Sequence, residues 1–468
     1  MVSSFLKNKD KFVDINDVYL YKLIPPPIDK KTHSYFNYGV RMTPFYDLEK
    51  GRLGKILVTS IPGRCVTTDA DMYVTLIDNN ALAAMPKGKH STEESGISRI
   101  LLYSDEVIAD IEAKKGEMGA SPIGYNGGDF DGDGQFDIQI GGSIFPSSRY
   151  RLGERPIDLR DPARSVRVSR NSVFVSSKFG NILAELKEGG VFFSRMEADV
   201  VKTVFSSALP DSVTARVVSG NQQDNFNKLQ PIPDFDGDGF DELAVFTTGS
   251  LHILTSSESY SFSNKLSLTV PAGNYFVGGR GDYDEDGIGD FWLLKFIPRS
   301  ASMAFFVRGG DMKKVYGRGD SSLGIEDVSF LRMEGDREYT EAGVTGSMSF
   351  RAGDVDGDGI PDFTVSDHFA LNRSGAYFIL PGSVVRGEKG TIRTSDERIL
   401  KVRAEIFSFI GVPNQHVDNF DFDKDGYDDL FITADSDTEA GIEAGSVYVL
   451  SGKKIIEKYS RIRDGKPD

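Results

Sequence analysis

One short acidic pattern recurs five times in this chain, and it constrains the fold more than any other feature. Each copy has Asp at its first, third and fifth positions, Gly at the sixth and Asp or Glu at the ninth. The copies are "DFDGDGQFD" (129–137), "DFDGDGFDE" (234–242), "DYDEDGIGD" (282–290), "DVDGDGIPD" (354–362) and "DFDKDGYDD" (421–429). Crowded carboxylates repel one another in a compact fold, so the repetition predicts that each copy holds a cation.

Calcium explains the spacing of the acids. Ca²⁺ prefers about six to eight oxygen ligands at ~2.3–2.6 Å, and a tight loop supplies them from alternating positions. The glycine takes the sharp turn, which a residue with a Cβ adopts only at a cost. An EF-hand loop opens in the same way but closes with Glu at its twelfth position, so these loops are shorter. Magnesium is the weaker alternative, because it tolerates a crowded protein cage poorly.

The predicted calcium ligands occupy the same five positions in every copy. Side-chain carboxylates come from positions one, three, five and nine, and a backbone carbonyl comes from position seven. About five ions are expected. The residues are Asp129, Asp131, Asp133, Gln135 and Asp137; Asp234, Asp236, Asp238, Phe240 and Glu242; Asp282, Asp284, Asp286, Ile288 and Asp290; Asp354, Asp356, Asp358, Ile360 and Asp362; and Asp421, Asp423, Asp425, Tyr427 and Asp429.

A strand-like run follows each acidic copy. The runs are "IQIGGSIF", "LAVFTT", "FWLLKF", "FTVSDH" and "LFITAD", which are rich in β-branched and aromatic residues and lack helical periodicity. Each loop is therefore predicted to join two strands in a hairpin. A second phrase, "SGAYFILPG" (374–382) and "AGSVYVLSG" (444–452), is predicted to close a four-stranded unit.

The loops and these closing phrases resemble the FG-GAP repeats of integrin alpha subunits. That resemblance covers most of residues 38–452 and implies an all-β, seven-bladed β-propeller with calcium loops in five blades. Two weaker units complete the count: "DLEKGRLGKILVTS" (47–60), which lacks two of the acids, and residues 169–190, which lack an acidic loop. Six or eight blades are the alternatives. The Gly-Ala-Pro part of the family motif is poorly kept.

Three segments are expected along the chain. Residues 1–37 contain "IPPPIDKK" and are predicted to form an extended N-terminal arm, which closes the ring or reaches a neighbouring subunit. Residues 38–452 form the propeller, and residues 453–468 form a C-terminal tail.

The predicted function is that of a non-catalytic binding, adhesion or assembly module. In the resembling family the calcium loops are structural, and a protein or glycan ligand binds on the opposite face. We expect recognition in the longest variable connections, which are 79–125, 143–168, 309–351 and 383–416. A carbohydrate-active propeller, either a lectin or a polysaccharide lyase, is the alternative. No catalytic residue is predicted, because the five histidines are scattered and none lies in a nucleophile motif.

Two Arg-Gly-Asp sequences occur, at 280–282 and 318–320. Both are interpreted as turns without a receptor, since Asp282 is already a predicted calcium ligand.

Charge and composition narrow the partners and the location. The formal net charge of −16 makes nucleic acid an unsuitable partner. The single cysteine, Cys65, excludes an internal disulfide, and no apolar run approaches the ~20 residues that span a bilayer. The N-terminus has no apolar core of a secretory signal peptide, so a signal was removed or export uses another route. Calcium sites favour an extracellular setting or the surface of a virus particle.

Overall fold

The fold is described from a computed structural model. The described residues are 11–26, 38, 41–47, 52–59, 74–93, 97–101, 127–128, 130–131, 137–140, 143–149, 157–158, 164–167, 172–175, 182–187, 190–197, 200–208, 229–247, 250–255, 263–271, 274–296, 303–318, 322–336, 353–367, 370–404, 416–417, 420–434, 436–441 and 444–465.

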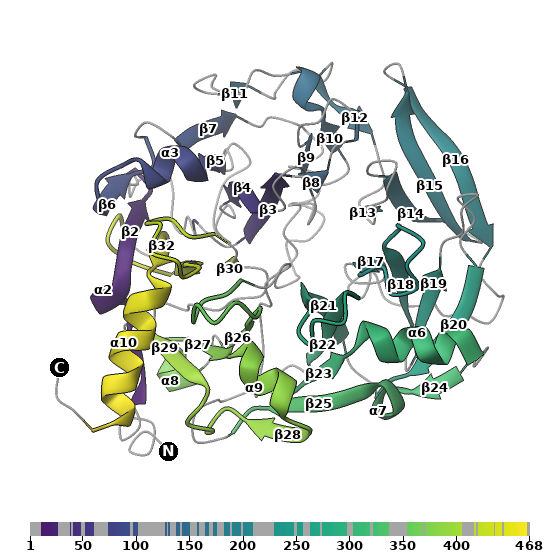
Figure 1. The fold of residues 1–468 in the computed structure, drawn as a ribbon. Helices are drawn as coiled ribbons and strands as arrows, with labels where there is room; N and C mark the ends of the chain where they lie inside the picture. The colour runs from purple at the N-terminus through teal and green to yellow at the C-terminus, as the bar shows by residue number, and fades with distance from the viewer. Residues whose placement is uncertain are drawn as a thin grey trace.

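Seven β-sheets are arranged around a common centre in this part of the chain (Figure 1). Within each sheet, strands that follow one another along the chain pair in antiparallel fashion, as the blades of a propeller do. The predicted all-β, seven-bladed propeller is therefore confirmed. We number the sheets as blades 1 to 7 in chain order.

The first three blades come from the N-terminal half of the sequence. Blade 1 contains β3 (Arg41–Asp47), β4 (Arg52–Thr59), β5 (Val74–Asp78) and β7 (Ile97–Leu101). Blade 2 contains β8 (Gly127–Gly128), β9 (Asp137–Ile140), β10 (Ser143–Phe145) and β12 (Val166–Arg167). Blade 3 contains β13 (Ser172–Val175), β14 (Ile182–Lys187), β15 (Gly190–Glu197) and β16 (Val200–Ala208).

The other four blades carry the remaining acidic loops. Blade 4 contains β17 (Leu229–Ile232), β18 (Glu242–Thr247), β19 (Ser250–Thr255) and β20 (Ser263–Thr269). Blade 5 contains β21 (Asn274–Gly281), β22 (Asp290–Phe296), β23 (Met303–Val307) and β25 (Ser329–Glu334). Blade 6 contains β26 (Phe363–Asp367), β27 (Ala376–Leu380) and β29 (Leu400–Arg403). Blade 7 contains β30 (His416–Val417), β31 (Leu430–Ala434), β32 (Ser446–Leu450) and β2 (Tyr19–Ile24).

Five blades gain an extra parallel strand from a segment of the next blade around the ring. In four cases that segment lies between the third and fourth strands of its own blade, and in the fifth, β1, it precedes β2, the fourth strand of blade 7. The pairs are β6 (Gly88–Ser91) on β2, β11 (Ile157–Asp158) on β7, β24 (Ser322–Gly324) on β20, β28 (Gly390–Arg393) on β25, and β1 (Val13–Asp14) on β29. These strands tie neighbouring blades together at their outer edges.

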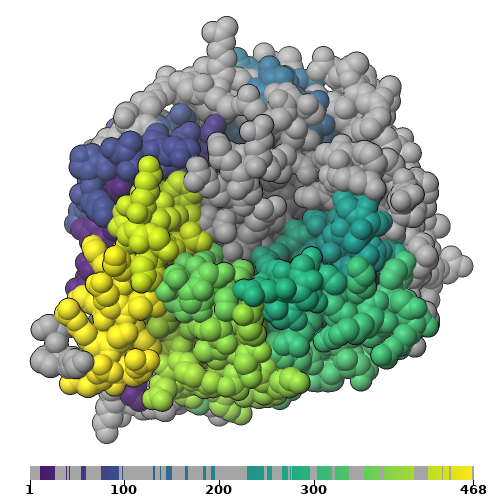
Figure 2. Space-filling model, in the orientation of Figure 1, coloured from purple at the N-terminus to yellow at the C-terminus, as the bar shows by residue number. Residues whose placement is uncertain are grey.

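The N-terminal segment completes the last blade. Strand β2 pairs antiparallel with β32, so residues from opposite ends of the sequence share one sheet, as Figure 2 shows where purple meets yellow. Leu20, Tyr21 and Leu23 are buried in the core between blades 7 and 1. Residues 13–24 thus close the ring by completing the last blade, because their apolar side chains fill this core. The expected C-terminal tail is mainly α10 (Gly452–Arg463), which packs through Ile455 and Tyr459.

The hydrophobic core lies between adjacent blades. Separate clusters join blades 4 and 5, blades 5 and 6, blades 6 and 7, and blades 7 and 1. Between blades 5 and 6 the rings of Trp292 and Phe363 stack with centroids 3.8 Å apart. Because each blade buries both faces, its strands are apolar on both sides, as in "AYFIL" and "SVYVL".

The phrases predicted to close their units are third strands instead. Residues 376–380 and 446–450 form β27 and β32. In blade 6 the short helix α9 and then the fourth strand β29 follow, whereas in blade 7 α10 follows and the fourth strand, β2, comes from the N-terminal segment. The helices after third strands are α3 (Asn79–Ala83), α6 (Gly309–Arg318), α9 (Gly382–Gly387) and α10, and the 3₁₀ helix Ser147–Arg149 takes this place in blade 2. Three four-residue helices complete the list: α2 (Ile15–Val18), α7 (Ile325–Val328) and α8 (Ala370–Arg373). Within the described ranges no helix has the length and apolar character to cross a membrane.

Candidate metal centres

Four of the five acidic loops lie between the first and second strands of a blade. They join β8 to β9, β17 to β18, β21 to β22, and β30 to β31, and each of these strand pairs is antiparallel. The loop at 354–362 leads into β26, and the residues just before it lie outside the described ranges. The predicted hairpins are thus present wherever both strands are described.

Carboxylates converge in the four loops of blades 4 to 7. Within each group, one carboxylate oxygen per residue lies within 4.8 Å of the others. The groups are Asp234, Asp236, Asp238 and Glu242; Asp282, Asp284 and Asp290; Asp354, Asp356 and Asp362; and Asp421, Asp423 and Asp425. Of the other predicted ligands, Asp286, Asp358 and Asp429 do not join these groups. In blade 2, Asp131 and Asp137 are described, whereas Asp129, Asp133 and Gln135 lie outside the described residues.

Two left-handed residues fold each of these four loops. The sixth-position glycines have φ near +90°, as the sequence predicted: Gly239 at 89°, Gly287 at 80°, Gly359 at 86° and Gly426 at 90°. The fourth position is also left-handed, although two of the four residues there, Glu285 and Lys424, carry a Cβ and have φ of 58°. Glycine occupies this position in three of the five copies, which is the sequence signal for this second left-handed residue, and it was not predicted.

Backbone N–H groups inside the turn orient the acids. The sixth-position glycine donates to the first-position carboxylate at 2.8–2.9 Å in all four loops. The seventh-position N–H donates to the fifth-position carboxylate at 2.8–3.2 Å. These bonds hold the carboxylates of positions one and five in place in the four loops, whose seventh residues are Phe240, Ile288, Ile360 and Tyr427. The carbonyl role of the four seventh-position residues themselves stays a prediction.

The ninth-position aspartates fasten each loop to the rest of its blade. One oxygen accepts a hydrogen bond from the second-position N–H, and the other accepts one from the residue that opens the helix after the third strand. The first set of bonds measures 2.6 Å at Asp137, 2.9 Å at Asp290, 2.8 Å at Asp362 and 2.8 Å at Asp429. The second set, from Ser147, Gly309, Gly382 and Gly452, measures 2.7, 2.9, 2.8 and 3.1 Å in the same order.

Three of these helices open with glycine because the loop backbone is too close for a side chain. A Cβ on Gly309, Gly382 or Gly452 would lie 2.3 Å from the carbonyl oxygen of the eighth loop residue. This contact explains the glycine that ends "SGAYFILPG" and "AGSVYVLSG". Loop, helix and third strand therefore form one packed unit in blades 5, 6 and 7.

The long variable connections begin at the same edge of the propeller as the acidic loops. The connections at 79–125, 309–351 and 383–416 follow a third strand, and 143–168 begins with one, β10. In blades 2, 5 and 6 the residue that opens the helix after the third strand contacts the ninth-position acid. The fourth strands β7, β12, β25 and β29 also lie within these connections, and the described parts between the third and fourth strands form helices and the parallel extra strands. The expectation that these connections lie opposite the calcium loops is wrong for those parts, because first and third strands of an antiparallel sheet run in the same direction.

Neighbouring loops are joined through their eighth residues. The N–H of Asp354 donates to Asp428 Oδ2 at 2.9 Å, and the N–H of Asp428 donates to the carbonyl of Asp354 at 2.8 Å. Arg280, just before the loop of blade 5, forms a 2.7 Å ion pair with Asp241 of blade 4. No role was predicted for these eighth-position acids, although Asp occurs there in two of the five copies.

Burial raises the pKa of the acids at these sites. Loss of contact with water is the main cause, and neighbouring carboxylates add to it, while backbone N–H groups oppose it. The pKa is raised to about 7 at Asp137 and Asp290 and to about 8 at Asp429. It is raised well above its usual range at Glu242 and Asp362. Such groups need a positive charge nearby to stay ionised at neutral pH.

The residues present fit a hard divalent cation such as calcium. Every group is built from carboxylate oxygens, without the His or Cys that zinc favours. Three buried carboxylate oxygens in these groups have no hydrogen-bond partner: Glu242 Oε1, Asp284 Oδ1 and Asp423 Oδ1. A buried carboxylate oxygen without a partner is costly, and a cation would compensate it.

The first Arg-Gly-Asp sequence is engaged within the fold. Arg280 pairs with Asp241, and Asp282 accepts hydrogen bonds from the N–H groups of Asp286 and Gly287 at 3.1 and 2.9 Å. Of the second sequence, Arg318 ends α6, and residues 319–320 lie outside the described residues.

No protein-family model matches the chain, and no curated protein matches it. Among solved structures, the WD40 domain of coronin from Toxoplasma gondii is similar, with 11% sequence identity and a TM-score of 0.46, over 93% of this chain and 85% of that one.

Proposed function

We propose that this protein is a calcium-stabilised β-propeller that acts as a non-catalytic binding, adhesion or assembly module. The observation that carries the proposal is the convergence of carboxylates at equivalent loops of four consecutive blades. Calcium at these loops would be held by the acids of positions one, three, five and nine, and it would fix the hairpin between the first two strands. The proposal includes a relationship to the FG-GAP repeat family. The position of the loops between the first two strands and the left-handed glycines support it.

The setting we propose is extracellular or on the surface of a virus particle, where calcium is abundant. We place the protein or glycan ligand on the face opposite the calcium loops. The strand ends at that face are joined by the links between blades, and the longest of these links, 102–126, 209–228, 337–352 and 405–415, lie outside the described residues.

Two measurements test the proposal. Elemental analysis and equilibrium dialysis of the purified protein should find about five calcium ions per chain, and magnesium at the same concentration should not replace them. A protein without bound calcium would contradict the metal proposal. A glycan-array screen with product analysis tests the role of the module: cleavage of a glycan would contradict a non-catalytic function, whereas capture without cleavage would identify the ligand class.

A further inference from the structure

The loop of blade 4 differs from the other loops at its ninth position. Here Glu242 stands where the other copies have Asp, so the carboxylate is carried on one more methylene. Glu242 is fully buried. Its Oε2 accepts the N–H of Phe235 at 3.0 Å, as the equivalent aspartates do with their second-position N–H.

The second oxygen of Glu242 has no partner. In blades 2, 5, 6 and 7 the equivalent oxygen accepts the N–H that opens a helix, but Glu242 Oε1 is buried and makes no hydrogen bond. This oxygen is therefore not committed to holding the blade together. It can bind a cation without losing a hydrogen bond, whereas the equivalent aspartate oxygens already accept the N–H of a helix.

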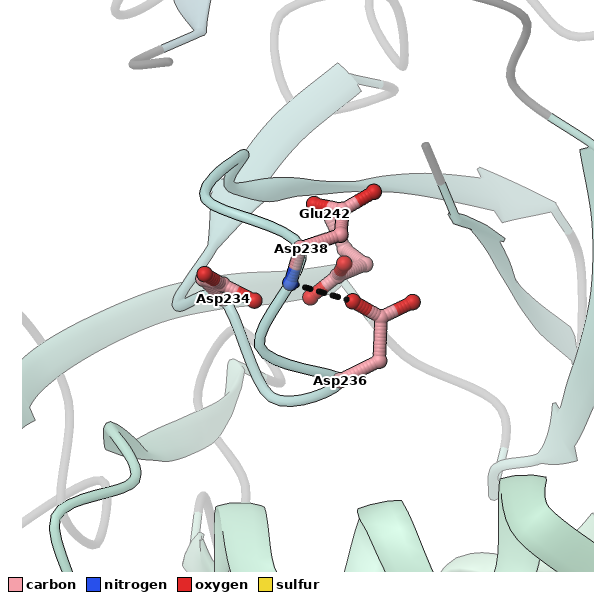
Figure 3. A group of neighbouring side chains, drawn as sticks. All are labelled: Asp234, Asp236, Asp238 and Glu242. Atoms are coloured by element: carbon pink, nitrogen blue, oxygen red, sulfur yellow. Dashed lines mark hydrogen bonds between the residues drawn. The ribbon is translucent and has the colours of Figure 1, made fainter. Parts of the chain in front are cut away.

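The group around Glu242 also contains more acids than the others. Four carboxylates contribute an oxygen to the cluster in blade 4, whereas three do so in each of blades 5, 6 and 7. Figure 3 shows the four side chains grouped around a single turn, with the N–H of Asp238 donating to Asp236 at 3.1 Å. In calcium loops the number of charged ligands is one of the properties that set the affinity.

Cationic side chains reduce the negative charge of two other loops. Lys87 pairs with Asp423 at 2.7 Å in blade 7, and Arg308 pairs with Asp284 at 3.2 Å in blade 5. A calcium ion that binds these third-position acids competes with the basic group. In blade 4 a basic group also lies beside the loop, since Nζ of Lys313 is 3.3 Å from the position that a Cβ on Gly237 would take.

From this geometry we infer that the loop 234–242 is a distinct, high-affinity calcium site, and that Glu242 is the residue that determines it. The inference rests on the proposed calcium function and adds an order in which the sites are occupied. Blade 4 binds its ion first, and the loops whose ninth-position aspartate accepts a helix N–H bind theirs at higher calcium concentration. At intermediate calcium the protein would carry one ion in blade 4 and few in blades 5, 6 and 7.

Calorimetric titration of the calcium-free full chain tests the inference. The wild-type protein should show one tight equivalent, at least about tenfold tighter than the rest. Glu242→Asp keeps the charge but shortens the side chain, and it should remove the tight class while leaving the total number of ions unchanged. The matched control is Asp362→Asn in blade 6, which should remove one weak equivalent and keep the tight one.

A second variant distinguishes loss of calcium affinity from a folding defect caused by substitution of the buried Glu242. Asp234 is only partly buried, and Asp234→Asn should also abolish the tight class, with folding checked by circular dichroism and by the fluorescence of the single tryptophan. Equal affinities at all sites, or a tight class that survives both substitutions, would overturn the inference and leave the calcium function standing. A chain that binds no calcium at all would remove both.

Discussion

Blades 6 and 1 each place a helix after the third strand, but they fix the start of that helix in different ways. In blade 6 the loop acid Asp362 accepts the N–H of Gly382 at 2.8 Å. In blade 1 the aligned ninth-position residue is Lys55, which lies directly across the sheet from Asp78, and Asp78 accepts the N–H of Ala81 at 3.0 Å to cap α3.

This comparison indicates that a blade of this protein can hold the start of its helix without a bound metal ion. Blade 1 replaces the acid by a base and moves the carboxylate to the third strand, so that charges of opposite sign face each other. Blade 6 keeps the acid and gathers Asp354 and Asp356 beside it, and these like charges need a cation. Calcium should therefore stabilise blades 4 to 7 and leave blade 1 nearly unaffected.

Chelation should have the largest effect and tests this contrast directly. Each site with free calcium ~100-fold above its Kd adds about 2.7 kcal/mol to folding, provided that the unfolded chain binds none. Removing calcium should lower the melting temperature sharply, and calcium but not magnesium should restore it. Hydrogen exchange should speed up in β22, β26 and β31 but little in β4 and β5. Equal protection in both regions with and without chelator would contradict the contrast.

The attachment of the N-terminal strand β2 to the rest of blade 7 should depend on an ion pair and not on calcium. Lys22 of β2 is buried and lies 2.8 Å from Asp437 and 2.6 Å from Glu439. Lys22→Met leaves Asp437 buried without its cation, so we expect a loss of about 3–5 kcal/mol in the free energy of unfolding. Denaturant titration measures it, and the loss should be the same with and without calcium.

Lys89 provides the matched control for Lys22. It pairs with the same Glu439 at 2.8 Å, but its side chain is 52% exposed. Because exposed ion pairs contribute little, Lys89→Met should cost less than about 1 kcal/mol. Equal losses for Lys22→Met and Lys89→Met would show that the buried pair does not fix β2 in blade 7.

The contact between helix and loop in blade 6 gives a smaller effect. In Gly382→Ala the new Cβ meets the carbonyl oxygen of Pro361 at 2.3 Å, so the helix must move away from the loop. We expect a loss of about 1–3 kcal/mol, measured by thermal unfolding, together with weaker binding of one calcium ion. Gly387→Ala, at the other end of the same helix, meets nothing within 4 Å and should be neutral. A neutral Gly382→Ala would contradict the packed unit of loop and helix.

The smallest effect is expected at the first Arg-Gly-Asp sequence. Asp282→Glu should weaken one calcium site and leave any attachment of cells unchanged, because Asp282 and Arg280 are both engaged within the fold. Adhesion assays beside calcium titrations measure the two properties. Loss of attachment with calcium binding intact would make this sequence a recognition motif.

The acidic loops were predictable from the sequence because their geometry is local. Nine residues contain the carboxylates, the N–H groups that orient them and the glycine that turns the chain, so the pattern at 282–290 or 354–362 already specifies the turn. The β-character of the runs that follow is equally local, since "FWLLKF" and "LFITAD" leave no helical face. The blade count came from counting these repeats together with a family resemblance.

Which segments of the chain pack against one another depends on the tertiary structure. Residues 13–24 complete blade 7 because Leu20, Tyr21 and Leu23 fill a core between two sheets, and no pattern within the segment names that core. The ninth-position acid likewise depends on a helix about twenty residues further along the chain. The sequence determined the turns, the strands and the acids available to a metal. Long-range packing determined which strands lie side by side, because matching apolar faces must be brought together from distant parts of the chain.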